Sequence, residues 1–308
     1  MLSRELIDKL ARTPQSQVLL YALGLTLLRL VLFPYLMRTL PHLRSGSYKV
    51  ARFFNEAADS IVYASILIFF VIRPFVFQTF TIPSGSMVPT LLVGDFIGIN
   101  KAVYRYTNPQ RFDTVVFRPP VRATMANQVD EAGNVNVDFI KRLIGLPGDV
   151  VELRQGELFI NGKRFDQPWV HLMRNVPGSL ELYEDLPPEI AAGVPKASFK
   201  LVRRSDELIP LNYDEFDVNA SQNVMARPNG IPPYSIAEDY SIADPAEGLR
   251  LKESPAQPIP PGHYLFMGDN RLNSFDGRGW GLVERSAIVG RAEFIWWPLS
   301  RIGRIQRN

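Results

Sequence analysis

Two long apolar runs near the N-terminus place the strongest limit on how this chain can fold. Residues 18–37 read VLLYALGLTLLRLVLFPYLM, about twenty nearly all apolar residues, which is the length needed to cross a bilayer. Arg29 and Pro34 interrupt this run, and an arginine at mid-depth costs about 2.5–3.5 kcal/mol unless it reaches the interface or finds a partner. The second run, residues 57–72, is shorter, but the apolar residues 75–80 extend it. We therefore expect a membrane anchor in residues 1–80, with helices at about 17–37 and 57–77.

The segment between the two runs is basic, and this sets the expected orientation. It carries Arg38, Arg44, Lys49 and Arg52, with the acidic Glu56 at its end. Basic connectors tend to stay in the cytoplasm, so the chain after residue 80 is expected on the outer side of the membrane. Basic residues before the first run weaken this bias. Two buried core helices of a soluble protein would also produce such runs, and that alternative stays open at this point.

After residue 95 the pattern changes to short runs that are typical of β-strands. Gly156 and the pair Asn161-Gly162 predict two hairpin turns. Residues 166–262 are rich in proline and charge, which argues against long helices there. We expect a mainly β core from residues 81–150 and 263–308, with an inserted lobe of β-ribbons and loops at 151–262. Strands are expected at residues 96–99, 114–117, 139–146, 150–153, 158–160 and 287–297.

The composition excludes several kinds of site and partner. The chain contains no cysteine, which removes disulfides, thiolate metal ligands and a cysteine nucleophile. The three histidines, His42, His171 and His263, have no paired spacing, so neither a metal site nor a cofactor is expected. The net charge of +3 is small and gives no reason to expect a nucleic-acid partner.

A tight turn after the second apolar run presents a candidate nucleophile. Residues 81–95 read TIPSGSMVPTLLVGD, where local turn chemistry should fix the backbone. Most serines in such loops are ordinary turn residues, and Ser86 becomes a candidate only if a base lies beside it. A Ser-His-Asp arrangement with His171 or His263 stays open but has little in its favour. The G-x-S-x-G and S-x-x-K patterns are both absent at Ser86.

The better candidate base is Lys141. It lies in residues 138–144, DFIKRLI, where strand alternation places it on the same face as Phe139 and Leu143. A lysine on an apolar face is desolvated, which lowers its pKa and leaves the neutral amine that a general base requires. The alternative is that Lys141 extends to solvent, or that Arg142 faces inward in its place.

Four segments, in this order, resemble the successive conserved boxes of the bacterial type I signal peptidases, also called leader peptidases. They read IPSGSMVPTL at residues 82–91, RFDTVVF at 111–117, FIKRLIGLPGD at 139–149 and GDNRLNSFDGR at 268–278. Each box alone is a modest signal, whereas four in sequence after two membrane runs are highly specific. The resemblance covers roughly residues 57–149 and 264–297, and between them it is a matter of placement only.

The resemblance implies a role for each matching residue in a serine peptidase with a Ser-Lys dyad. Ser86 matches the family nucleophile and Lys141 its general base. Ser84 matches the position whose hydroxyl joins the Ser86 backbone N–H in the oxyanion hole, a kind of donor worth about 2.7–4 kcal/mol. Ser274 matches a second hydroxyl that hydrogen-bonds the lysine amine and orients it.

Four further residues match structural and substrate-binding positions of the family. Asp276 and Arg278 match an ion pair beside the dyad, and Ile82 and Ile140 match residues that shape shallow pockets for small substrate side chains. The sequence also departs from the family pattern. Leu272 stands where Asp is usual, Gly277 where Ser is common, and Phe112 where Gly is usual. These departures put local support in question, and leave the nucleophile and the base in place.

The fold class implied is a mainly β extracytoplasmic domain of coiled antiparallel sheets behind a pair of transmembrane helices. The function implied is an endopeptidase of the bacterial inner membrane that cuts signal peptides from exported preproteins after small-x-small sites. Its partners would be those preproteins and membrane lipid. Trp280, Trp296 and Trp297 fit either a lipid interface or core packing. The alternative function is a noncatalytic, membrane-tethered β-rich module for envelope assembly or binding.

Overall fold

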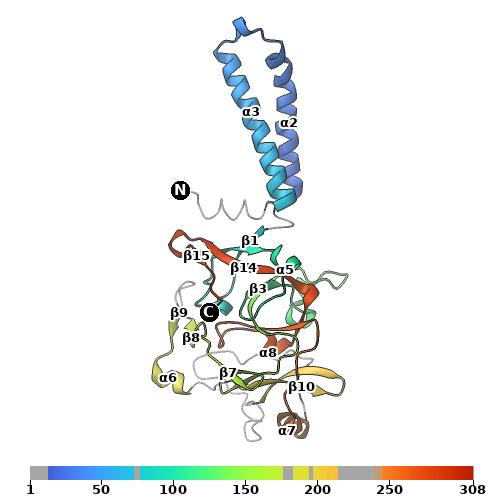
Figure 1. Ribbon diagram of the computed structural model, residues 1–308, viewed down its shortest axis with the longest axis vertical. Helices are drawn as coiled ribbons and strands as arrows, with labels where there is room; N and C mark the ends of the chain where they lie inside the picture. The colour runs from blue at the N-terminus through green and yellow to red at the C-terminus, as the bar shows by residue number, and fades with distance from the viewer. Residues whose placement is uncertain are drawn as a thin grey trace. The chain divides into compact units, whose positions relative to one another are not determined.

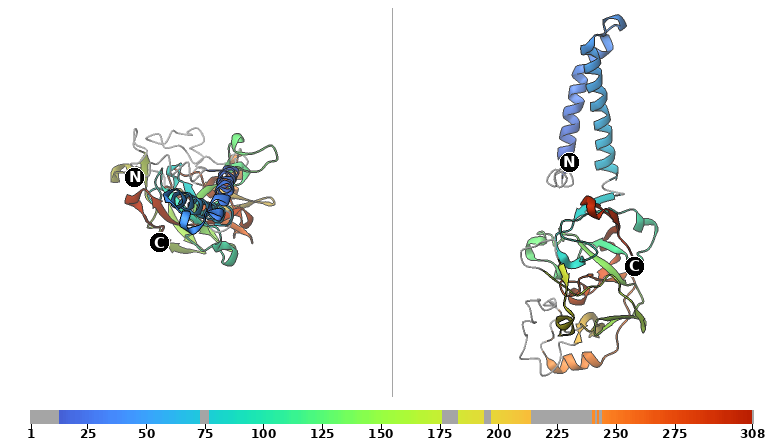
Figure 2. Two further views of the ribbon diagram at one scale, coloured as in Figure 1. Left: turned by 90° about the horizontal axis from the view of Figure 1, so that it is seen from above. Right: turned by 90° about the vertical axis from the view of Figure 1, so that its left-hand side faces the viewer.

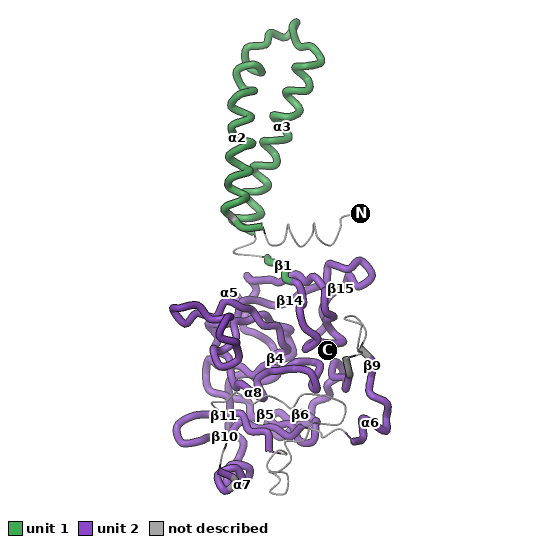
Figure 3. Tube along the Cα trace, turned by 180° about the vertical axis from the view of Figure 1, so that it is seen from behind, with its two compact units in different colours: residues 1–80 green, residues 81–308 purple. Residues whose placement is uncertain are grey.

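The computed structural model describes residues 13–72, 77–175, 183–193, 197–213, 240, 242 and 244–307. The chain divides into two compact units, residues 1–80 and 81–308, which Figure 3 distinguishes by colour.

The first unit is a pair of helices that run side by side (Figures 1 and 2). Helix α2 spans Gln15–Arg38 and keeps Pro34 within it, and α3 spans Gly46–Ile66 and continues as a π-helical segment, Leu67–Ile72. Both helices are long and apolar enough to cross a membrane, and only 6% of each apolar window is buried. Neither therefore forms the buried core of a soluble domain, and Arg29 of α2 finds a partner in an ion pair with Asp59 of α3.

The predicted start of the second helix, residue 57, was wrong. Helix α3 begins at Gly46, so Lys49 and Arg52 lie on the helix and not in a connector. The first part of α3 contains no continuous apolar run, because Lys49, Arg52 and Glu56 interrupt its apolar residues. These charged residues are compatible with a helix, since Arg52 and Glu56 form an i,i+4 ion pair at 2.7 Å. The predicted end was also wrong, since Phe77 begins a strand, while residues 73–76 lie outside the described residues.

The second unit is built from antiparallel sheets, as the sequence predicts. Within this unit the larger sheet has the order β2 (Phe96–Asn100), β14 (Ile288–Trp297), β3 (Thr114–Phe117), β4 (Phe139–Gly145), β12 (His263–Met267) and β13 (Val283–Glu284), with β15 (Gly303–Arg304) on β14. Strand β1 (Phe77–Thr81) spans the boundary between the two units. The five-stranded sheet has the order β11 (Glu207–Asn212), β10 (Phe199–Arg204), β5 (Val151–Arg154), β6 (Glu157–Ile160) and β7 (Lys163–Phe165). A separate ribbon pairs β8 (Met173–Asn175) with β9 (Tyr183–Asp185).

The α-helices in the described part of the second unit are short. They are α5 (Val103–Tyr106), α6 (Pro188–Gly193), α7 (Pro245–Glu253) and α8 (Gly277–Trp280). Among the described residues of the predicted lobe, 151–262, the longest is α7 with 9 residues. The expectation that this proline-rich region holds no long helix is therefore met in the part of it that the structure describes.

Two hairpin turns of the smaller sheet confirm the turn prediction. Gln155 and Gly156 join β5 to β6 with φ values of 48° and 83°, and Asn161 and Gly162 join β6 to β7 with 52° and 77°. Positive φ at both central residues is the signature of a type I′ turn, whose twist matches that of the flanking strands. These turns fix the register of the three strands.

The core lies in two clusters on opposite faces of β4. Leu143 packs with Val115, Phe117, Phe266 and Trp280, whereas the next residue, Ile144, belongs to the cluster of the smaller sheet. Trp280 is 1% exposed, so it packs in the core and not at a lipid interface. Trp296 packs edge-on against Phe96, with ring centroids 5.4 Å apart. Both faces of β4 are therefore packed against other side chains, so a residue of this strand such as Lys141 is buried whichever face it lies on.

Candidate active site

The candidate nucleophile sits on a loop that is closed at its base. This nucleophile loop, residues 82–95, connects β1 to β2 and carries Ser86 in a 3-10 turn, Gly85–Met87. The backbone N–H of Ile82 donates to Asp95 O at 2.9 Å, and that of Gly94 donates to Ile82 O at 2.8 Å. These two bonds fix the ends of the loop against each other, so the turn that presents Ser86 has a defined place.

Ser86 and Lys141 come together although 55 residues separate them in the sequence. Lys141 Nζ lies 2.8 Å from Ser86 Oγ and donates to Ile140 O at 3.0 Å. Ser86 is 7% exposed and Lys141 is 5% exposed. A hydroxyl and an amine at hydrogen-bond distance in a largely dry site are the arrangement of an activated nucleophile.

The surroundings of Lys141 favour its neutral form. Burial lowers the pKa of Lys141 to about 8, and the positive charge of Arg278 acts in the same direction, while the carboxylates of Asp276 and Asp269 oppose the shift. The amine also lies 5.5 Å from the centroid of the Phe139 ring on the same strand face. Strand alternation therefore predicted the facing of Lys141 correctly.

The sequence posed Lys141 and Arg142 as alternatives for the interior, and both are buried. Arg142 is 1% exposed on the opposite face of β4, where its guanidinium pairs with Asp269 through Nε–Oδ1 at 2.8 Å and Nη2–Oδ2 at 2.6 Å. It also lies 4.5 Å from the centroid of the Trp169 ring. Because β4 is covered on both faces, neither the Lys141 nor the Arg142 side chain reaches solvent.

The segment before α8, residues 268–276, contacts the backbone of the turn that carries Ser86. Asn270 donates from its backbone N–H to Ser86 O at 3.1 Å and from its side-chain amide to Gly85 O at 3.2 Å. A Cβ placed on Gly268 would overlap the Ser274 side chain and the Ser86 carbonyl, so only glycine fits this approach. Sequence reasoning missed Asn270, although it lies inside one of the four quoted boxes.

The predicted ion pair beside the dyad is present. Arg278 Nε and Nη2 each lie 2.8 Å from a carboxylate oxygen of Asp276, and both side chains are at most 1% exposed. Burial alone would raise the pKa of Asp276, but the Arg278 guanidinium and the backbone N–H groups of Gly268 and Arg278 outweigh it and hold the pKa below its usual value. The carboxylate is therefore charged next to the dyad.

The predicted hydrogen bond from Ser274 to Lys141 is not formed. Ser274 is 7% exposed, and its Oγ has no hydrogen-bond partner among the described residues. The reason is that the Lys141 amine turns to Ser86 Oγ and Ile140 O instead. Ser274 nevertheless lies against Gly268, beside the Ser86 carbonyl, so its hydroxyl is close to the dyad.

The remaining predicted residues lie on the nucleophile loop and on β4. Ser84 is exposed, and its Oγ lies 3.4 Å from Ser86 Oγ. Ile82 is 3% exposed at the base of the nucleophile loop, and Ile140 is half-buried on β4. The histidines are engaged elsewhere, since His171 pairs with Asp185 and His263 with the carbonyl of Pro261.

Comparison with known proteins assigns the chain to a family. A family model described as signal peptidase, peptidase S26, matches residues 54–297. The chain belongs to this signal peptidase family.

Signal peptidase I of Aquifex aeolicus is 33% identical over 243 residues, which cover 77% of this chain and 82% of that protein. Signal peptidase I of Pseudomonas fluorescens is 31% identical over 265 residues, covering 78% and 72%. A solved signal peptidase I from Enterococcus faecalis is 24% identical, with a TM-score of 0.28, and covers 60% of this chain and 97% of that one.

As a member of the signal peptidase family the chain is a serine endopeptidase, and its departures from the family pattern have local explanations. Phe112 has a φ of 69°, in the left-handed region where glycine is the least strained residue. Its ring packs 4.6 Å from the Trp169 ring and 6.2 Å from the Phe165 ring. The aromatic contacts offset the backbone strain. Leu272 is 4% exposed, so its apolar side chain is buried.

Restoring the family's serine at position 277 is expected to destabilise this signal peptidase. A Cβ on Gly277 would meet Phe266 O at 2.8 Å and Leu265 Cδ1 at 2.7 Å, and the backbone carbonyl cannot move aside cheaply. We expect Gly277→Ser to lower the free energy of unfolding by about 1–3 kcal/mol, as overpacking does. Thermal unfolding of the purified protein measures this. The matched control is Gly193→Ser, where nothing lies within 4 Å of an added Cβ; equal melting temperatures for the two variants would contradict the prediction.

Proposed function

We propose that this chain is a membrane-anchored endopeptidase that removes signal peptides from exported preproteins, with Ser86 as nucleophile and Lys141 as general base. The single observation that carries the proposal is the 2.8 Å separation between Ser86 Oγ and a buried Lys141 amine. The relatives named signal peptidase I supply the substrate class.

In the first step the neutral amine of Lys141 takes the proton of the Ser86 hydroxyl as Oγ attacks the scissile carbonyl carbon. The resulting oxyanion lies where the Ser86 backbone N–H and the Ser84 hydroxyl can donate to it. When the intermediate collapses, the C–N bond breaks and the Lys141 ammonium returns its proton to the leaving amine. Water then attacks the acyl-enzyme, with Lys141 again accepting the proton, and Ser86 is regenerated.

An extended substrate strand fits beside β4. Strand β12 pairs with β4 from Gly145 to Arg142, so on that side residues 139–141 face no described strand. A peptide added there would gain backbone hydrogen bonds, which supply affinity without regard to sequence. Ile82, at the base of the nucleophile loop, and Ile140, on β4 next to Lys141, would shape the pockets that admit only small side chains before the cut.

The anchor brings the site to its substrate. We assign α2 and α3 to two membrane crossings, with residues 81–308 on the outer face of the bacterial inner membrane, because the basic residues around the turn between the helices favour the cytoplasm. A signal peptide is itself held in the bilayer, so fixing both partners to one lipid surface raises their effective concentration.

The test is cleavage of one exported precursor by the full-length protein in detergent, with the new N-terminus of the product sequenced. We expect a single cut after a small-x-small site, and an intact precursor when Ser86→Ala replaces the parent protein. A cut at any other kind of site would contradict the substrate class. An equal rate of cutting by the parent protein and by Ser86→Ala would contradict the role of Ser86 as nucleophile.

A further inference from the structure

The C-terminal end of the described chain contacts both the loop that carries Ser86 and the strand that carries Lys141. We infer that the C-terminal strap, residues 301–307, is a positioning element of the active site, and that Arg301 is its principal contact. This inference rests on the proposed function, since it concerns how Ser86 and Lys141 are held for that reaction. The strap would hold the nucleophile loop and β4 so that Ser86 Oγ and Lys141 Nζ stay within hydrogen-bond distance.

Arg301 holds the far side of the nucleophile loop. It follows β14 in a 3-10 turn, Leu299–Arg301, and its Nε and Nη2 each lie 3.0 Å from a different carboxylate oxygen of Asp95. Nη2 also donates to the backbone carbonyl of Thr90 at 3.2 Å. Asp95 is 2% exposed, so this two-point contact forms largely out of water, where a planar guanidinium is well suited to a carboxylate.

The residues that Arg301 contacts are the ones that close the loop. Asp95 accepts the Ile82 N–H on its backbone oxygen at 2.9 Å and the Leu92 N–H on its carboxylate at 2.8 Å. Thr90 donates its hydroxyl to Asp269 at 2.5 Å. Asp269 is in turn the partner of Arg142, the residue after Lys141. A displacement of Arg301 would therefore disturb both the nucleophile loop and β4, the strand that carries Lys141.

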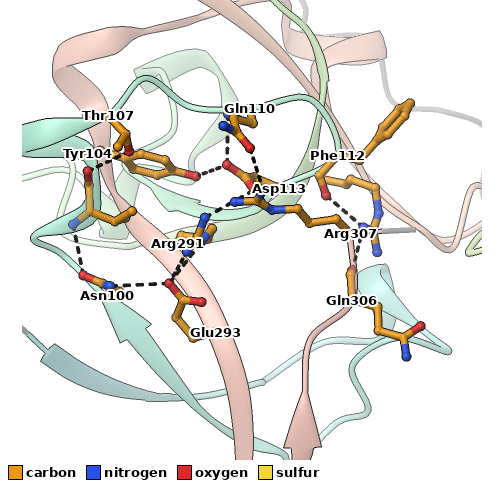
Figure 4. Close-up of polar contacts among 12 residues, drawn as sticks. Asn100, Tyr104, Thr107, Gln110, Phe112, Asp113, Arg291, Glu293, Gln306 and Arg307 are labelled. Carbon is orange, nitrogen blue, oxygen red and sulfur yellow. Dashed lines mark hydrogen bonds and ion pairs between the residues drawn. The ribbon is translucent and has the colours of Figure 1, made fainter.

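A second set of contacts ties the strap to β4 and to the start of β3. The backbone carbonyl of Gln306 accepts from Arg142 Nη1 at 3.3 Å. Arg307 Nε forms an ion pair with Asp113 Oδ1 at 2.6 Å, and Figure 4 shows this arginine reaching the Asp113 carboxylate. Asp113 is fully buried, and its backbone oxygen accepts the N–H of Leu143 at 2.8 Å.

The two sets of contacts explain why the strap matters for the reaction. Ser86 belongs to the loop that Arg301 holds, and Lys141 belongs to the strand that Gln306 and Arg307 hold. Proton transfer needs the 2.8 Å separation between their side chains, and a displacement of about 1 Å far from the chemistry can cost about 10²-fold in rate. The strap touches neither reacting atom, so its members are positioning residues.

The experiment compares Arg301→Gln and Arg301→Lys with Arg304→Gln in the full-length protein. Arg304 lies in the same strap but takes no part in these contacts: its guanidinium is exposed and has no ion pair or hydrogen bond with a described residue. We expect Arg301→Gln to lower kcat about 10- to 100-fold with KM within about twofold, because the loss is one of reacting geometry. Arg301→Lys should keep part of the rate, and Arg304→Gln all of it.

Two further readouts separate positioning from simple destabilisation. All rates are measured well below the melting temperature of each variant, and the pH at half-maximal rate should stay unchanged in Arg301→Gln because the surroundings of Lys141 are intact. Amide hydrogen exchange should quicken in residues 82–95 of Arg301→Gln and not of Arg304→Gln. A loss of rate that only follows the unfolded fraction would overturn the inference.

The outcomes also distinguish this inference from the proposed function. If the parent protein cleaves the precursor and Arg301→Gln does so with the same kcat, the strap is not a positioning element and the function stands. If the parent protein does not cleave, or Ser86→Ala cleaves equally well, the proposed function fails first. Should Arg301→Gln not fold, Arg301→Lys decides, and a kcat equal to that of the parent protein overturns the inference.

Discussion

Replacement of Lys141 by methionine is expected to lower the rate of precursor cleavage by about 10²–10⁴-fold, the usual contribution of a general base. Methionine keeps the length and the apolar stem of the side chain, so the variant removes the amine 2.8 Å from Ser86 Oγ with little change in packing. Ser86→Ala should lose at least as much, because it removes the nucleophile. Initial rates on a purified precursor measure both effects.

The double variant provides the control for this prediction. We propose that Ser86 and Lys141 act as one unit, so Ser86→Ala combined with Lys141→Met should be no slower than Ser86→Ala alone. Additive losses would mean that the two side chains act independently. Lys141→Arg should be as inactive as Lys141→Met, because a guanidinium stays protonated and cannot accept the proton.

The pH profile of the parent protein tests the same amine by its titration. Only the neutral form of Lys141 accepts a proton, and burial lowers its pKa to about 8. The rate should therefore rise with pH up to about 8 and then level off, with about a tenfold fall for each unit below that value. A profile that still rises near pH 10 would indicate an ordinary, solvated lysine and would contradict the buried base.

The sequence predicted that Ser86 and Lys141 come together, and their side chains lie 2.8 Å apart, because each residue sits in a segment whose conformation its neighbours determine. A turn of small residues around Ser86 and a period of two around Lys141 each predict their own conformation, and the four boxes connect them. The hairpin turns at Gly156 and at Asn161-Gly162 follow from the same kind of short-range signal. Strand positions were correspondingly close to the observed bounds.

What the sequence missed depends on contacts between distant segments. The pairing of Arg301 with Asp95 joins residues 206 positions apart, and no local pattern predicts it. Alternation alone assigns Lys141 and Arg142 to opposite faces of β4, but it cannot tell that both faces are covered. The start of α3 at Gly46 was missed because charged residues alternate with apolar ones in its first three turns, which leaves no continuous apolar run.

The second large effect is expected on stability, from the buried pair of Asp276 and Arg278. Arg278→Met removes the cation and leaves Asp276, with its side chain fully buried, without its main charge partner. Such an unpaired charge costs about 3–5 kcal/mol of unfolding free energy, which corresponds to about 10 °C in melting temperature for a domain of this size. Thermal unfolding of the detergent-solubilised protein near pH 8 measures it.

The pH dependence and the double variant identify the cause of that loss. With the guanidinium gone, burial dominates and the pKa of Asp276 should rise above its unfolded value. The folded state then binds more protons than the unfolded state between those two pKa values, so the deficit should deepen as pH rises through that window and shrink at about pH 5. Adding Asp276→Asn to Arg278→Met removes the unpaired charge and should recover part of the melting temperature. A deficit that is the same at both pH values and unchanged in the double variant would show that Arg278 contributes through packing and not through its charge.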